Sequence, residues 1–127
     1  MDLVQWLNVQ LDIDTARATA AAEEDGPNWH YDGRAVITHR ERDLVAVGSQ
    51  DFIDRERGEH IAEHDPARVL REIDAKRQML AAWSRGAPTG VIDVKYARGY
   101  ANALSEAVRV IALSYVGRPG YREEWRP

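Results

Sequence analysis

The chain has 127 residues, which suits one domain with a single core, and we predict a single domain over residues 1–127. Hydrophobic residues make up 44% of the chain and charged residues 30%, a composition typical of soluble globular proteins and not of disordered or fibrous ones. The absence of cysteine excludes disulfide bonds and thiolate metal sites, and a net charge of −4 argues against a general nucleic-acid-binding surface.

The start of the chain has neither the basic residues nor the unbroken apolar run of a secretory signal. No stretch of about 18 consecutive apolar residues occurs anywhere. We therefore expect a cytoplasmic protein that does not associate with membranes.

Residues 2–24 predict a long first helix, because apolar side chains recur there at steps of three and four residues. They are Leu3, Leu7, Leu11, Ala18, Ala21 and Ala22, with Trp6 and Ile13 widening the stripe. Asp25-Gly26-Pro27 should end this helix by turn chemistry and by the missing N–H of proline.

Three short runs suited to strands follow, over residues 28–31, 34–39 and 43–48. Asp32-Gly33 lies between the first two and predicts a tight two-residue hairpin turn, and residues 39–43 form the second turn. We expect a three-stranded antiparallel meander with one face covered by helix, since so small a sheet is not stable alone.

Residues 51–64 predict a weaker helix, interrupted by Gly58. Asp65-Pro66 then marks a strong helix start, because aspartate caps well and proline fits the first helical position. The helix over residues 66–85 should bury Val69, Leu70, Ile73, Leu80 and Trp83, and residues 86–90 should end it.

The last long helix is predicted over residues 92–114, with a stripe of Ala97, Ala101, Leu104, Val108, Ile111 and Tyr115. The tail from Tyr121 to Trp125 should dock, because its two aromatic side chains would otherwise form an exposed apolar patch. The predicted fold class is therefore α+β: a long N-terminal helix, a three-stranded antiparallel meander, then one short and two long helices with a docked C-terminal tail.

Three segments carry a resemblance: His60-Ile-Ala-Glu-His64-Asp-Pro-Ala-Arg-Val-Leu-Arg-Glu with its continuation to Arg77, Trp29-His30 followed by Val45-Ala-Val-Gly48, and Tyr121-Arg-Glu-Glu-Trp125. Together they resemble an uncharacterised family of small proteins from high-GC Gram-positive bacteria and their phages. The resemblance covers nearly the whole chain. It implies no known activity, cofactor or catalytic residue.

His60, Glu63 and His64 match the pattern H-x-x-E-H, in which two histidines hold zinc and the glutamate acts as base in certain peptidases. Residues four apart share a helix face, so both histidines could bind one metal. However, Pro66 pushes Asp65 out of helical geometry, which places His64 at or past the helix end, and no later residue is marked as the third ligand of a catalytic zinc. The alternative that we favour is a structural corner between two helices.

Arg68 and Arg71 form the other candidate site, because a helix N-terminus attracts anions and these cations lie in its first turns. Interleaved acids, and an aspartate that already fills the cap, favour a solvated face instead. His30 and His39 should flank the meander, where either could approach His60 or His64. Nucleotide-binding loops and the serine-hydrolase elbow are absent from the sequence.

We therefore expect a small non-enzymatic accessory or protein-interaction protein that needs no cofactor and binds an unidentified protein partner. The broad helical stripes also suit a homodimer. One alternative is a metal-dependent hydrolase or metal-binding protein that uses His60, His64 and Glu63. A second is an anion or nucleic-acid binder through Arg68 and Arg71, although the net charge disfavours a nucleic-acid partner.

Overall fold

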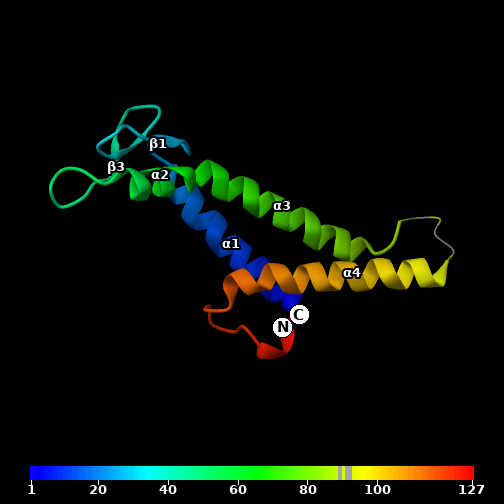
Figure 1. Cartoon of the computed structure of the whole chain (residues 1–127). Helices are drawn as coiled ribbons and strands as arrows, with labels where there is room; N and C mark the ends of the chain where they lie inside the picture. Colours follow the sequence, from blue (N-terminus) through cyan, green and yellow to red (C-terminus); the bar gives the residue numbers. More distant parts are fainter. Residues whose placement is uncertain (89, 91–92) are drawn as a thin grey trace. The chain divides into compact units, whose positions relative to one another are not determined.

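A computed structural model describes residues 1–88, 90 and 93–127 and shows an α+β fold with the predicted order of elements (Figure 1). The elements are α1 (Leu3–Ala21), β1 (Trp29–Tyr31), β2 (Val36–Thr38), β3 (Leu44–Ala46), α2 (Arg55–Glu63), α3 (Pro66–Arg85), α4 (Val94–Ala112) and two short 3₁₀ helices, η1 (Leu113–Tyr115) and η2 (Glu123–Trp125). The chain groups into two compact units. Unit 1 comprises Met1–Asp12 and Asp74–Pro127, and unit 2 comprises Ile13–Ile73.

Helix α1 begins with a reciprocal pair of hydrogen bonds between Asp2 and Gln5. The Asp2 carboxylate accepts from the Gln5 amide at 2.8 Å, and Gln5 Oε1 accepts from the Asp2 amide at 2.9 Å. Leu7 and Leu11 are fully buried, as the stripe predicts. The prediction for Ile13 is wrong, because its side chain is 38% exposed. Ile13 follows Leu11 by two residues, which turns it about 200° around the helix axis and away from the buried face.

Unit 1 is built around a cluster of aromatic side chains that docks the C-terminal tail. The Trp6 ring centroid lies 5.4 Å from that of Trp125, 5.8 Å from that of Tyr121 and 6.4 Å from that of Tyr115. Trp6 Nε1 also donates to the Pro119 carbonyl at 3.1 Å. The predicted docking of the tail is therefore confirmed, and both chain ends lie close together in unit 1 (Figure 1).

Two basic side chains of α3 add polar contacts within unit 1. Arg77 donates to the Asp12 carboxylate at 2.6 Å. Lys76 Nζ lies 3.2 Å from the Tyr115 hydroxyl and 5.0 Å from the centre of its ring. These contacts tie the second half of α3 to the other parts of unit 1.

Helix α3 has the bounds that the sequence predicts, but one of its predicted core residues is exposed. Ile73 and Leu80 are buried, whereas Trp83 is 40% exposed. Ala101 of the α4 stripe is exposed as well. Asp93 caps α4 by accepting from the Lys95 and Tyr96 amides. Ile92, the predicted first residue of this helix, lies outside the described residues. Thr89, which belongs to the predicted end of α3, lies outside them as well.

Unit 2 contains the predicted antiparallel meander, with strand order β1-β2-β3 and Tyr31 opposite Val36. The first turn is not the predicted two-residue turn, because residues 32–35 lie between the paired residues Tyr31 and Val36. Gly33 has the expected positive φ, at 96°, whereas Asp32 acts through its side chain. Asp32 Oδ1 accepts from the Arg34 and Ala35 amides at 2.8 Å. These hydrogen bonds to the charged form lower the pKa of Asp32, that from Ala35 most strongly.

Helix α2 covers the sheet and is shorter than predicted. It begins at Arg55 because Asp54 caps it, accepting from the Arg57 amide at 3.0 Å, and the chain before it includes Asp51 at a φ of 62°. Gly58 does not interrupt the helix. It is buried against the ring of Tyr31, where a Cβ at this position would overlap Cδ2 and lie 2.6 Å from Cε2.

Candidate functional site

The corner between α2 and α3 is held by Asp65, which is only 9% exposed. Its Oδ1 accepts from the Arg68 amide at 2.9 Å, and this confirms the predicted N-terminal cap of α3. Its Oδ2 accepts from the Trp29 amide at 3.1 Å, which joins the corner to β1. The Ala67 amide adds a hydrogen bond to the Pro27 carbonyl at 3.0 Å. The corner is therefore fixed both within the helix and to the sheet.

His60 and His64 lie next to each other at this corner, with ring centroids 4.4 Å apart and planes tilted by 41°. His64 is the C-terminal cap residue of α2, where the proline argument places it. Its Nδ1 lies 2.7 Å from the His60 carbonyl. Because a carbonyl oxygen only accepts, Nδ1 carries the proton of this hydrogen bond, and in the neutral ring Nε2 keeps a lone pair.

Glu63, the proposed base, is the last residue of α2 and its side chain is 76% exposed. Its Oε2 lies 3.8 Å from the guanidinium of Arg68. Among the described residues, no group of three or more histidine, aspartate or glutamate side chains is placed to hold a metal ion. The histidine pair thus offers two ligands, whereas catalytic zinc needs three from the protein; metal binding and hydrolysis by this motif stay predictions.

The other two histidines also form a pair. His30 on β1 and His39 after β2 have ring centroids 4.7 Å apart and nearly perpendicular planes, at 72°. His30 lies opposite Ile37, so His39 is its diagonal neighbour across the two strands. The sequence predicts both positions at the meander. Their mutual contact depends on the strand register, which the sequence did not fix to the residue.

Arg68 lies between two carboxylates. Its Nε donates to Glu72 at 2.9 Å, and its other side faces Glu63. Arg71 is exposed. An anion at this helix start would compete with two acidic side chains for Arg68 and with Asp65 for the cap. Anion binding here stays a prediction, and the negative charge of these three side chains opposes it.

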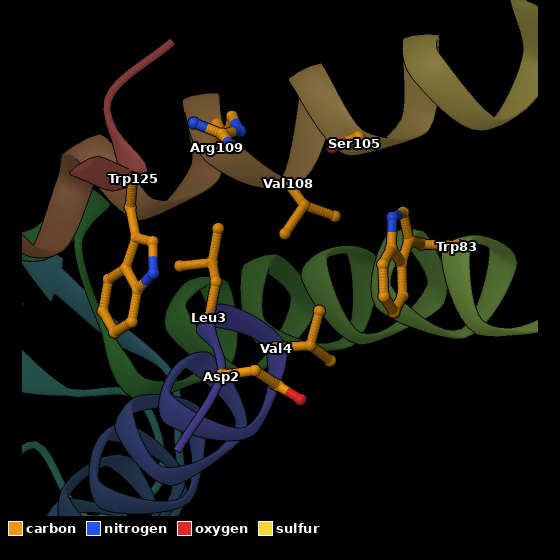
Figure 2. A pocket seen from close by; sticks show the side chains of 8 residues that line it. All are labelled: Asp2, Leu3, Val4, Trp83, Ser105, Val108, Arg109 and Trp125. Carbon is orange, nitrogen blue, oxygen red and sulfur yellow. The ribbon is translucent and has the colours of Figure 1, made fainter. Parts of the chain in front are cut away.

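Unit 1 contains a pocket of about 250 Å³ that we call the Trp83 pocket. It is lined by Asp2, Leu3, Val4, Trp83, Ser105, Val108, Arg109 and Trp125. Figure 2 shows Val108 pointing from α4 toward Leu3 and Val4 of α1, with the indoles of Trp125 and Trp83 on either side. Arg109 donates to the carbonyls of Glu124 and Arg126, at 3.0 and 3.1 Å, and so holds the tail beside the pocket.

The sequence did not indicate this pocket, because its apolar residues were assigned to the core. One signal was present: Met79 and Trp83 stand four residues apart on α3, and both are large apolar side chains. In the structure they are 36% and 40% exposed. Residues four apart share a helix face, so α3 presents two large side chains on one face.

A model of a family of unknown function, DUF6221, matches residues 1–127. The chain belongs to this family. No curated protein and no solved structure matches the chain. DUF6221 membership confirms the resemblance to an uncharacterised family, and it assigns no activity to the corner or to the pocket. Within the part of the DUF6221 chain that the structure describes, no helix is both long enough and apolar enough to cross a membrane.

Proposed function

We propose that this chain is a small non-enzymatic accessory protein of bacterial or phage origin, located in the cytoplasm, that binds another polypeptide through the Trp83 pocket. The supporting observation is the pocket itself. Its lining combines apolar side chains with Asp2, Ser105 and Arg109, two tryptophans flank it, and one of them is 40% exposed. Tryptophan is enriched among the residues that contribute most to binding free energy at protein interfaces.

The size of the pocket indicates its occupant. Sites for small molecules usually measure about 300–1,000 Å³, and the Trp83 pocket, at about 250 Å³, is smaller. A cavity of this size suits one apolar side chain inserted from a partner, with the exposed face of Met79 and Trp83 as surrounding contact area. The partner is therefore a polypeptide with an aliphatic or aromatic anchor. A second copy of this chain is one such polypeptide.

The test is to select peptides that bind the wild-type chain from a random displayed library, then to measure their affinity for two variants. We expect Trp83→Ala to weaken binding at least tenfold, because it removes one wall of the pocket. Tyr96→Ala is the matched control: Tyr96 is 53% exposed on α4 and does not line the pocket. Equal affinity for wild type and Trp83→Ala would refute the proposal. Sedimentation equilibrium on both proteins shows whether the partner is a second copy.

Metal binding by His60 and His64 is a second candidate, supported by the contact of His64 Nδ1 with the His60 carbonyl, which leaves Nε2 as the ligand atom. Imidazole suits Zn²⁺, Cu²⁺ and Ni²⁺, and a backbone carbonyl that accepts from the other ring nitrogen is a common support for a histidine ligand. Titration with Zn²⁺ should show binding that His64→Ala removes. His39→Ala, in the other histidine pair, is the control. If His39→Ala loses zinc binding and His64→Ala keeps it, the metal is held by the other histidine pair and this candidate is refuted.

A further inference from the structure

A second pocket lies within unit 2, at the same corner that carries the histidine motif. It measures about 380 Å³, and we call it the Trp29 pocket. His64 contributes to its lining, together with residues from the second half of α1, the start of α3 and β1. Its volume falls within the range of sites for small molecules, which the Trp83 pocket does not reach.

The walls of the Trp29 pocket are mainly apolar because of the sequence of two helices. Ala18 and Ala21 lie one turn apart on α1, and their small side chains leave space that larger residues would fill. Pro66 and Val69 face them from the first turn of α3. A ligand body without charge would replace water along these walls, which is favourable in proportion to the apolar area covered.

One polar group at the pocket lacks a partner. Trp29 lines the pocket, and its Nε1 is buried without a hydrogen-bond partner among the described residues. A buried donor without a partner carries a free-energy cost. An acceptor atom of a ligand that reached this nitrogen would remove the cost.

The charged side chains in the lining of the pocket are Asp14 and Arg17, and His64 lines it as well. Arg17 and Asp14 form an ion pair at 3.9 Å, which is too long for a hydrogen bond. Arg17 is far more accessible, with 72% of its side chain exposed against 19% for Asp14. A charged ligand would therefore meet the guanidinium first, and guanidinium pairs best with a carboxylate, through two parallel hydrogen bonds.

We propose that the Trp29 pocket binds a small amphipathic carboxylic acid, with its apolar body against Ala18, Ala21, Pro66 and Val69 and its carboxylate at Arg17. His64 lies in the lining of the same pocket, which places one residue of the His60–His64 motif at a binding site that needs no metal. The proposal is independent of the Trp83 pocket, which lies in unit 1.

Three probes with the same eight-carbon body separate the possible head groups: octanoate, 1-octanol and octylamine. Each is titrated into the full-length protein, and binding is followed by the amide and indole N–H resonances. We expect octanoate to bind at least tenfold more tightly than the alcohol or the amine, and to shift the Trp29 indole resonance. Equal affinity for acid and alcohol, tighter binding of the amine, or no binding of any probe would overturn the proposal.

Variants locate the site. Ala21→Leu should weaken octanoate binding at least tenfold because it fills the pocket, and Arg17→Gln should weaken binding of the acid but not of the alcohol. The matched control is Ala20→Leu, an exposed position on the same helix that does not line the pocket. If Ala20→Leu weakens binding as much as Ala21→Leu, the acid binds elsewhere. Trp83→Ala should leave octanoate binding unchanged, which separates this test from that of the proposed function.

Discussion

Gly58 has no room for a side chain, although it lies inside a helix. A Cβ there would lie 2.6 Å from Cε2 of Tyr31. The Tyr31 ring cannot easily move away, because its hydroxyl lies 2.8 Å from the Ile53 carbonyl and 2.9 Å from that of Gly33. The absence of a side chain therefore sets the distance between α2 and the sheet.

We predict that Gly58→Ala lowers the free energy of unfolding by about 1–3 kcal/mol, because the added methyl group overpacks the contact with Tyr31. The matched control is Gly99→Ala in α4, where a Cβ would meet no atom of the described residues within 4 Å. That change should raise stability by up to about 1 kcal/mol, through helix propensity alone. Urea denaturation measures both, and a stabilised Gly58→Ala would contradict the assigned packing.

Gly58 and Trp83 show where sequence reasoning stops at this scale. A glycine in a helical pattern predicts weakness, and only the position of Tyr31 across the packing contact shows that the glycine is required. Trp83 fits the periodic stripe of α3, and periodicity identifies a face without stating how deeply each residue of that face is covered. Both depend on neighbours distant in sequence. Asp65-Pro66, by contrast, was predictable because capping is local.

At the scale of elements, Asp65 links two helices and a strand with one side chain. It caps α3 and accepts from the Trp29 amide of β1, so each carboxylate oxygen serves a different element. The order and type of the elements could be predicted, since periodicity and caps are local signals. The ends of the elements could not always be predicted. Helix α2 begins at Arg55, four residues after the predicted start, because Asp54 caps it.

We predict that Asp65→Ala destabilises the protein by more than the loss of an ordinary cap, which costs about 1–2 kcal/mol, because the Trp29 amide also loses its acceptor. Asp65→Asn keeps one oxygen and should retain the cap bond to Arg68 while losing much of the link to Trp29. Thermal melts give the ranking wild type, then Asn, then Ala. Equal stability of the Asn and Ala variants would show that the cap contributes nothing.

At the scale of the whole molecule, two helices continue from one compact unit into the other. Residues 3–12 of α1 belong to unit 1 and residues 13–21 to unit 2, whereas residues 66–73 of α3 belong to unit 2 and residues 74–85 to unit 1. Unfolding one unit alone would require each helix to break in its middle. We therefore expect the chain to unfold in one cooperative step, as predicted for a single domain.

A mutation in unit 1 tests this coupling. Trp125→Ala removes a buried member of the aromatic cluster and should lower the free energy of unfolding by about 3–5 kcal/mol. If unfolding is cooperative, hydrogen-exchange protection of the Val36–Thr38 amides in unit 2 should fall by the same free energy. Unchanged protection in β2 would show that the two units unfold separately. Glu124→Ala, at an exposed side chain of the same tail, is the control.

The contact between Trp6 and Trp125 has an optical consequence. Their rings lie 5.4 Å apart with planes tilted by 47°. Electronic transitions of two indoles this close and this inclined couple to each other, and the coupled pair produces circular dichroism bands of opposite sign. The docked tail therefore has a spectroscopic signature of its own, which would vanish on release of the tail while the helical signal remained.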